Sequence, residues 1–230
     1  MKRDEETLLR EVANYYGDRL NQHGATPKGV DWNGENGQLN RFAQLARVID
    51  RADGFTLNDL GCGYGALVDF LSPRYANFQY YGYDVSAEMI AAARDRYRGR
   101  PFVSFNPGSI PEVVADYGIA SGIFNVRLGI TNTEWLDYLL GVLDVLDRTS
   151  LDGFAFNCLT SYSDQEKMRS DLFYADPCQL FDHCKRRYSK NVALLHDYGL
   201  YEFTIIVRKV SDGQIARRMA DRSTVGCNSQ

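Results

Sequence analysis

The sequence contains few cysteines, and none of them is spaced as a metal or redox site requires. There are 5 in the chain, at positions 62, 158, 178, 184 and 227. An odd number without a Cys-x-x-Cys pair argues against a disulfide scaffold, and Cys178, His183 and Cys184 match no standard zinc spacing. We therefore expect free thiols, a cytoplasmic location and no bound metal.

The chain also lacks long apolar runs and an excess of basic charge. No run is long enough to cross a bilayer, and residues 1–6 carry none of the apolar core of a signal peptide. Its 26 Lys and Arg are outnumbered by 30 Asp and Glu, giving a formal net charge of −4. Nucleic-acid-binding proteins usually carry a basic surface. We expect a small-molecule substrate, and neither membrane nor nucleic acid as a partner.

Apolar residues recur along the chain at alternating helical and strand spacings, which is typical of an α/β domain. The expected helices lie at 5–21, 39–49, 66–71, 86–97, 133–147 and 177–188, and the expected strands at 56–59, 78–83, 102–110, 119–126, 153–159, 192–196 and 200–208. Too few residues separate the last two strands for a parallel crossover, so we predict that they form an antiparallel hairpin.

The most informative stretch is a short apolar strand that ends in Asp59 and is followed by glycines at positions 61, 63 and 65. A helix comes next. Glycine lets the backbone turn sharply and approach a ligand with no Cβ in the way. A strand, a glycine loop and a helix in this order predict a site for a nucleotide-type cofactor.

A second acidic residue, Asp84, ends the next strand about 20 positions beyond the glycines, where it can bind ribose hydroxyls. Ser86 is the expected N-cap of the following helix. The acid before the glycines decides between cofactors: Asp59 would repel the pyrophosphate of a dinucleotide, but it suits the ammonium group of an amino acid.

The string Asp59-x-Gly61-x-Gly63-x-Gly65 resembles motif I of the class I S-adenosylmethionine (SAM) methyltransferases. Residues 84–89 resemble the same family's D-x-S-x-x-M signature. The resemblance spans roughly residues 38–209. It implies a Rossmann-like three-layer sandwich, with a mostly parallel seven-stranded sheet that ends in an antiparallel hairpin. It also divides the chain into a helical lid (1–35), a SAM-binding catalytic domain (36–210) and a flexible tail (211–230).

The resemblance assigns SAM as the cofactor and implies a set of residues that bind it. Arg41 is the candidate for the methionine carboxylate and Trp32 for the sulfonium. Ser109 stands where the family has an acid that binds adenine. The full set is Trp32, Arg41, Asp59, Gly61, Gly63, Gly65, Asp84, Val85, Met89, Ser109, Ile110 and Asn125.

Candidate catalytic residues lie near the carboxyl ends of the later strands, where this fold places its substrate. They are Asn125, Tyr174 and His196. Each has a purely structural alternative; for His196 it is a place in the hydrophobic core. No Asn-Pro-Pro-Tyr or Asp-Pro-Pro-Tyr follows the fourth strand, which favours a small-molecule acceptor over a nucleobase or glutamine.

The motifs leave several functions open. Methyl transfer to a small molecule is the first. A second is cyclisation of SAM to azetidine-2-carboxylate and methylthioadenosine, because Asp59 and Asp84 would hold SAM in the same way for both reactions. A catalytically silent partner subunit with this fold and an NAD-dependent oxidoreductase are further alternatives. Neither the acceptor nor the oligomeric state follows from the sequence.

Overall fold

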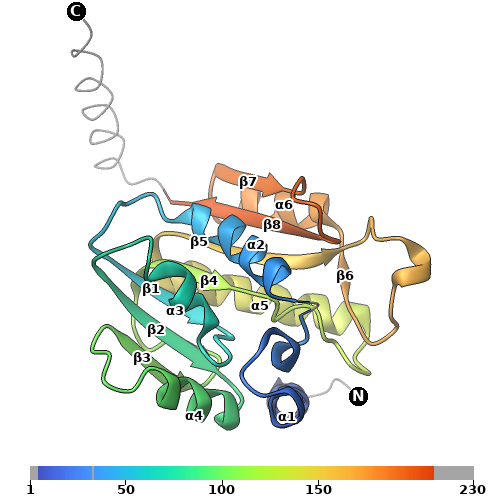
Figure 1. The fold of residues 1–230 in the computed structure, drawn as a ribbon. Helices are drawn as coiled ribbons and strands as arrows, with labels where there is room; N and C mark the ends of the chain where they lie inside the picture. The colour runs from blue at the N-terminus through green and yellow to red at the C-terminus, as the bar shows by residue number, and fades with distance from the viewer. Residues whose placement is uncertain (1–4, 33, 210–230) are drawn as a thin grey trace, which may run out of the picture.

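The computed structural model describes residues 5–32 and 34–209, which form a sheet with helices on both faces (Figure 1). The 8-stranded sheet has the order β3-β2-β1-β4-β5-β8-β7, with β6 paired to β5. Its strands are β1 Phe55–Leu60, β2 Phe78–Asp84, β3 Val103–Pro107, β4 Ala115–Ala120, β5 Ser150–Thr160, β6 Tyr174–Ala175, β7 Asn191–Leu195 and β8 Glu202–Arg208.

The predicted antiparallel hairpin is confirmed, since β8 pairs antiparallel with both β7 and β5. Strand β7 consequently runs in the same direction as β5, and β8 is the single reversed strand among those described. The two-residue strand β6 was not predicted. It pairs parallel with the end of β5 and brings Tyr174 beside Leu159.

Two hydrophobic cores separate the layers of the sandwich. One core packs α2, α3 and α4 on one face of the sheet, and the other packs α5 and α6 on the opposite face, with Leu8 of α1 at its edge. Figure 1 shows α2 and α3 on the viewer's side of the sheet and α5 behind it. The helices are α1 Glu5–His23, α2 Glu35–Leu45, α3 Ala66–Leu71, α4 Ala87–Arg96, α5 Asn132–Thr149 and α6 Pro177–Arg187, with short 3-10 turns at Pro27–Val30, Ala46–Val48 and Gln165–Lys167.

Side-chain caps fix where the helices begin. The predicted cap Ser86 accepts a hydrogen bond from the Met89 amide at 3.2 Å at the start of α4. Asp176 accepts from the amides of Cys178 and Gln179 at 2.8 and 3.1 Å at the start of α6. Both caps satisfy amide groups that the first turn of a helix leaves without partners.

The fourth strand is shorter than its apolar sequence predicts. We expected it at 119–126, but β4 begins at Ala115 and ends at Ala120. Gly122 follows with a φ of 77°, a left-handed conformation that turns the chain out of the sheet. Asn125 therefore lies in a loop well past the end of the strand, rather than at the strand end itself.

The buried centre of β5 provides a test of this core. Replacing Phe156, which is fully buried, with alanine should lower the free energy of unfolding by about 3–5 kcal/mol, because a cavity forms between packed layers. On the same strand, Leu151 is 59% exposed, and Leu151→Ala should change stability by less than about 0.5 kcal/mol. Urea unfolding of both variants measures the difference, and equal losses would contradict the assigned strand register.

Candidate functional site

A cavity opens at the carboxyl ends of β1, β2 and β4. It encloses about 960 Å³ of space between atoms, including its open mouth. Its walls come from the strand ends, the glycine loop, α1, the segment after α1, and α5. The lining residues are Leu9, Val12, Tyr16, Val30, Trp32, Gln38, Phe42, Asp59, Leu60, Gly61, Cys62, Gly63, Tyr64, Ala66, Leu67, Asp84, Val85, Met89, Gly108, Ser109, Ser121, Gly122, Ile123, Tyr138 and Val142.

The glycines of the loop after β1 serve two different purposes. A Cβ on Gly63 would lie 3.3 Å from Val30 Cγ1, so this glycine keeps open the space between the loop and the segment after α1. A Cβ on Gly65 would instead lie 2.7 Å from the ring of Tyr97. Gly61 and Gly63 line the cavity, whereas Gly65 allows the loop to pack against aromatic residues outside it.

Asp84 fastens the glycine loop to the end of β2. Its carboxylate accepts hydrogen bonds from the Gly63 amide at 2.9 Å and the Ser86 amide at 2.8 Å. Burial raises the pKa of Asp84, and these amide donors oppose that rise. The Asp84 carboxylate thus lines the cavity while the amides of Gly63 and Ser86 hold it in place.

Asp59 is the second carboxylate in the wall, and one of its oxygens has no partner. Oδ2 accepts from the Tyr80 hydroxyl at 2.5 Å, whereas the buried Oδ1 makes no hydrogen bond within the described part of the chain. Burial raises the pKa of Asp59 to about 7, and the nearby charge of Asp84 adds to the rise. A buried acceptor without a donor is costly, so the site suits a ligand that supplies one.

The other residues predicted to bind cofactor fall into two groups. Val85, Met89, Ser109 and Trp32 line the cavity together with the two acids. Ile110 does not line it and is 60% exposed.

Arg41 also lies outside the cavity wall. Its guanidinium donates two hydrogen bonds to Glu202, at 2.7 and 2.8 Å, and stacks over the Trp32 ring at 3.9 Å. Its Nε and Nη2 groups are the ones paired with Glu202, and its predicted contact with a cofactor carboxylate stays a prediction.

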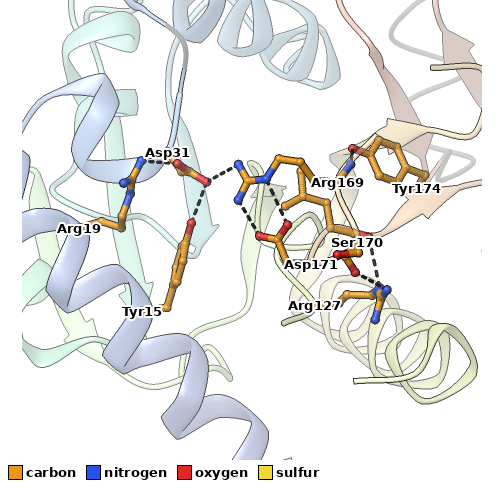
Figure 2. Close-up of polar contacts among 9 residues, drawn as sticks. Tyr15, Arg19, Asp31, Arg127, Arg169, Ser170, Asp171 and Tyr174 are labelled. Atoms are coloured by element: carbon orange, nitrogen blue, oxygen red, sulfur yellow. Dashed lines mark hydrogen bonds and ion pairs between the residues drawn. The ribbon is translucent and has the colours of Figure 1, made fainter. Parts of the chain in front are cut away.

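The first turn after α1 is tied to a loop that is distant in the sequence (Figure 2). Asp31 accepts a hydrogen bond from the Tyr15 hydroxyl at 2.9 Å and one from Arg19, both on α1. It also forms an ion pair with Arg169 at 3.9 Å, and Arg169 is held in turn by Asp171. Asp31 thereby joins α1 to the loop between β5 and β6, next to the cavity-lining residues on either side of it.

A protein of Mycobacterium tuberculosis named "Putative methyltransferase Rv1506c" is 59% identical to this chain over 165 residues, which cover 72% of the chain and 99% of that protein. The chain belongs to the class I SAM-dependent methyltransferases. The "Methyltransferase domain" family also matches residues 58–145, from the middle of β1 to the second half of α5.

Solved structures with the same fold are more distant in sequence. Magnesium protoporphyrin IX methyltransferase of Synechocystis, with bound SAH, has a TM-score of 0.61 at 11% identity and covers 90% of this chain and 100% of that one. Human N-acetylserotonin methyltransferase in complex with SAM has a TM-score of 0.62 at 14% identity, covering 91% of this chain and 61% of that one. At these identities the likeness establishes the fold of this methyltransferase.

None of the three predicted catalytic residues lines the cavity of this methyltransferase. The Asn125 side chain accepts from the Leu159 amide at 3.1 Å. The Tyr174 hydroxyl accepts from the Arg169 amide at 2.9 Å and so supports the loop of Figure 2. His196 is exposed rather than in the core. Their catalytic roles stay predictions.

Several cavity residues were not predicted from the sequence. Ser121, Gly122 and Ile123 line the wall because β4 ends early, and the glycine itself was the available signal. Tyr138 and Val142 lie one turn apart on α5. Leu9, Val12 and Tyr16 follow one face of α1, within the segment that was predicted as the lid. Helical spacing places apolar residues on one face of a helix, but it does not distinguish the protein core from a ligand cavity.

The raised pKa of Asp59 predicts how SAM binding depends on pH. If Asp59 must be ionised to pair with the SAM ammonium, SAM affinity should rise about tenfold per pH unit below pH 7 and level off above it. Deprotonation of the SAM amine near pH 8 should lower affinity again. Calorimetric titration from pH 5.5 to 9 measures this profile, and Asp59→Asn should bind more weakly and lose the acidic limb.

The raised pKa of Asp59 also predicts how the stability of the protein without SAM depends on pH. Because folding raises the pKa of Asp59, the folded state holds this proton more tightly than the unfolded chain does. Its contribution to stability is therefore complete below pH 4 and is lost as the pH rises toward 7. Asp59→Asn should lack that loss. Identical pH profiles for parent and variant, in both binding and stability, would contradict the assignment.

Gly63 tests whether the gap beneath Val30 holds the cofactor. Gly63→Val should abolish detectable SAM binding, because the side chain fills that gap, and the φ of 54° adds strain. Gly99→Val is a matched control with a similar φ of 80° and no atom within 4 Å of its Cβ. Both variants should lose comparable stability, but only Gly99→Val should still bind SAM in a thermal-shift titration. Binding by Gly63→Val would place the cofactor elsewhere.

Proposed function

We propose that this protein transfers the methyl group of SAM to a small-molecule acceptor inside the cavity at the ends of β1, β2 and β4. The observation that carries the proposal is the pair of buried carboxylates in one wall. Asp84 is fixed by backbone amides at the end of β2, and Asp59 offers an unpartnered oxygen at the end of β1. Two acids so placed suit the ribose hydroxyls and the ammonium group of one SAM molecule.

When bound, SAM supplies a methyl group on a sulfonium centre, and the protein supplies its position and its surroundings. Asp84 would hold the ribose and Asp59 the ammonium, and the glycine loop would let SAM approach the backbone with no Cβ in the way. Val85, Met89 and Ser109 would surround the adenine. Methyl transfer is an in-line displacement, so much of its catalysis comes from alignment of donor and acceptor.

Part of residues 1–35 would act as the lid of the site. Leu9, Val12 and Tyr16 of α1, with Val30 and Trp32 after it, supply one wall of the cavity. The Asp31 contacts to Tyr15, Arg19 and Arg169 would keep this wall closed over the cofactor. Closure of this kind excludes water from a reactive sulfonium.

The chemistry of the wall favours an acceptor without negative charge. Among the described residues that line the cavity there is no lysine, arginine or histidine. An acceptor with a phosphate or carboxylate would find no cationic side chain in this wall and would share the cavity with the two acids already there. The two named structural neighbours act, by their names, on a porphyrin and on N-acetylserotonin, which agrees with a small molecule as acceptor.

Incubation with SAM, followed by mass spectrometry, tests the proposed reaction. With SAM alone we expect no methylthioadenosine above the spontaneous rate. With a panel of neutral amines, which are nucleophilic without deprotonation, we expect SAH and a product heavier by one methylene. Gly63→Val serves as the control for background reaction. Rapid release of methylthioadenosine and azetidine-2-carboxylate from SAM alone would overturn methyl transfer in favour of cyclisation.

A further inference from the structure

Five residues from separate parts of the fold form a closed circuit of contacts beside the cavity. In order they are Trp32 after α1, Arg41 of α2, Glu202 of β8, Asn157 of β5 and Gly122 after β4. Trp32 and Gly122 line the cavity, and the other three lie behind them. The circuit therefore reaches the cavity only through the indole and the glycine on which it rests.

The contacts around the circuit are short and directional. Arg41 lies 3.9 Å over the indole of Trp32 and donates to both oxygens of Glu202, at 2.7 and 2.8 Å. Glu202 also accepts from the Asn157 side-chain amide at 2.7 Å. Asn157 in turn accepts from the Gly122 amide at 2.8 Å. Glu202 and Asn157 are thus each held by two hydrogen-bonding partners of the circuit.

The contact that closes the circuit requires glycine. A Cβ on Gly122 would lie 2.3 Å from Cζ2 of Trp32, so the edge of the indole rests directly on this backbone. Arg41 covers a face of the same ring. Together, Arg41 and Gly122 confine the indole against the cavity.

Because the ion pair between Arg41 and Glu202 is buried, replacing either residue should have a large effect. The side chain of Glu202 is 1% exposed and that of Arg41 is 11% exposed. Removing one member of such a pair leaves an uncompensated buried charge. Here that charge would be the Arg41 guanidinium, directly behind an aromatic ring. An unneutralised cation behind the ring would repel a second cation in front of it.

The position of Trp32 in the fold places it on the side of the proposed SAM site where the sulfonium would lie. Asp84 stands on β2, whereas Trp32 rests on the loop after β4, and β1 with Asp59 lies between these two strands. A SAM molecule with its ribose at Asp84 and its ammonium at Asp59 has its amino-acid end on the side of β4. The sulfonium belongs to that end, so the indole is the aromatic wall nearest its path.

We propose that Arg41 and Glu202 are positioning residues, which hold Trp32 so that its indole favours the cationic SAM over the neutral product SAH. This inference rests on the proposed SAM site. A face of an aromatic ring attracts a cation, and the attraction is strongest for tryptophan. Glu202 is essential to this preference because it neutralises the charge of the Arg41 guanidinium that lies against the indole. The product, having lost its charge with its methyl group, would be released more easily.

Calorimetric titration with SAM and with SAH tests the proposal through the ratio of the two dissociation constants. Trp32→Leu should reduce the preference for SAM by about fivefold, a loss typical of one cation–π contact. Trp32→Phe should keep part of the preference. Glu202→Gln should weaken SAM by about fivefold or more and leave SAH within about twofold. The Trp32→Leu, Glu202→Gln double variant should lose less preference than the two single losses added together, because the cation–π contact is already gone and only the repulsion by Arg41 remains.

Controls separate this outcome from its alternatives. Asp69→Asn breaks the exposed Arg96–Asp69 ion pair, outside the circuit, and should leave the ratio unchanged. If Arg41 instead binds the methionine carboxylate, Arg41→Met should weaken SAM and SAH equally, since both ligands carry that group. Equal losses in all circuit variants would overturn the proposal while SAM binding stands. A parent protein that binds neither ligand would overturn the proposed function itself.

Discussion

The site depends on the burial of two carboxylates at the ends of neighbouring parallel strands. Parallel strands end at one edge of a sheet, so β1 and β2 bring Asp59 and Asp84 into one wall. Burial raises the pKa of both, and the backbone offsets this for Asp84 through the amides of Gly63 and Ser86. Asp59 has a single donor, Tyr80, and retains an unpartnered oxygen. The unliganded protein therefore carries an unfavourable electrostatic arrangement that a ligand with an ammonium group would relieve.

The features that local sequence encodes were the ones that the sequence predicted well. The Ser86 cap accepts from an amide three residues away, so its spacing alone implies its geometry. The glycines and Asp84 were recognised from a motif, but the contact between Gly63 and Asp84 spans 21 positions and depends on the parallel pairing of β1 with β2. The end of β4 was misplaced because it too depends on a distant residue. Residues 119–126 are mostly apolar, and the turn at Gly122 is stabilised by Asn157, which lies on a different strand. No pattern in the sequence around Gly122 indicates that Asn157 is its partner.

Arg41 shows that the partner of a charged residue is equally hard to predict from the sequence. A guanidinium on the segment that precedes the glycine motif suggested a contact with the carboxylate of the cofactor. Its partner in the fold, Glu202, is 161 positions away in the sequence and becomes its neighbour only because β8 pairs with β5. Tyr174 was placed near a strand end correctly, yet the path of the loop between β5 and β6 directs its hydroxyl to Arg169. The paths of loops such as the one between β5 and β6 decide which residues at the strand ends face the cavity.

The composition of the wall constrains how an acceptor could be activated. Its two carboxylates are the groups assigned to SAM, and its described lining residues include no histidine or lysine that could serve as a base. Burial raises the pKa of Tyr16 and of Cys62, so neither is poised to accept a proton as an anion near neutral pH. A general base is needed only for an acceptor that is protonated at the working pH. This wall therefore favours an acceptor that is already nucleophilic when it binds, with catalysis resting on alignment and the exclusion of water.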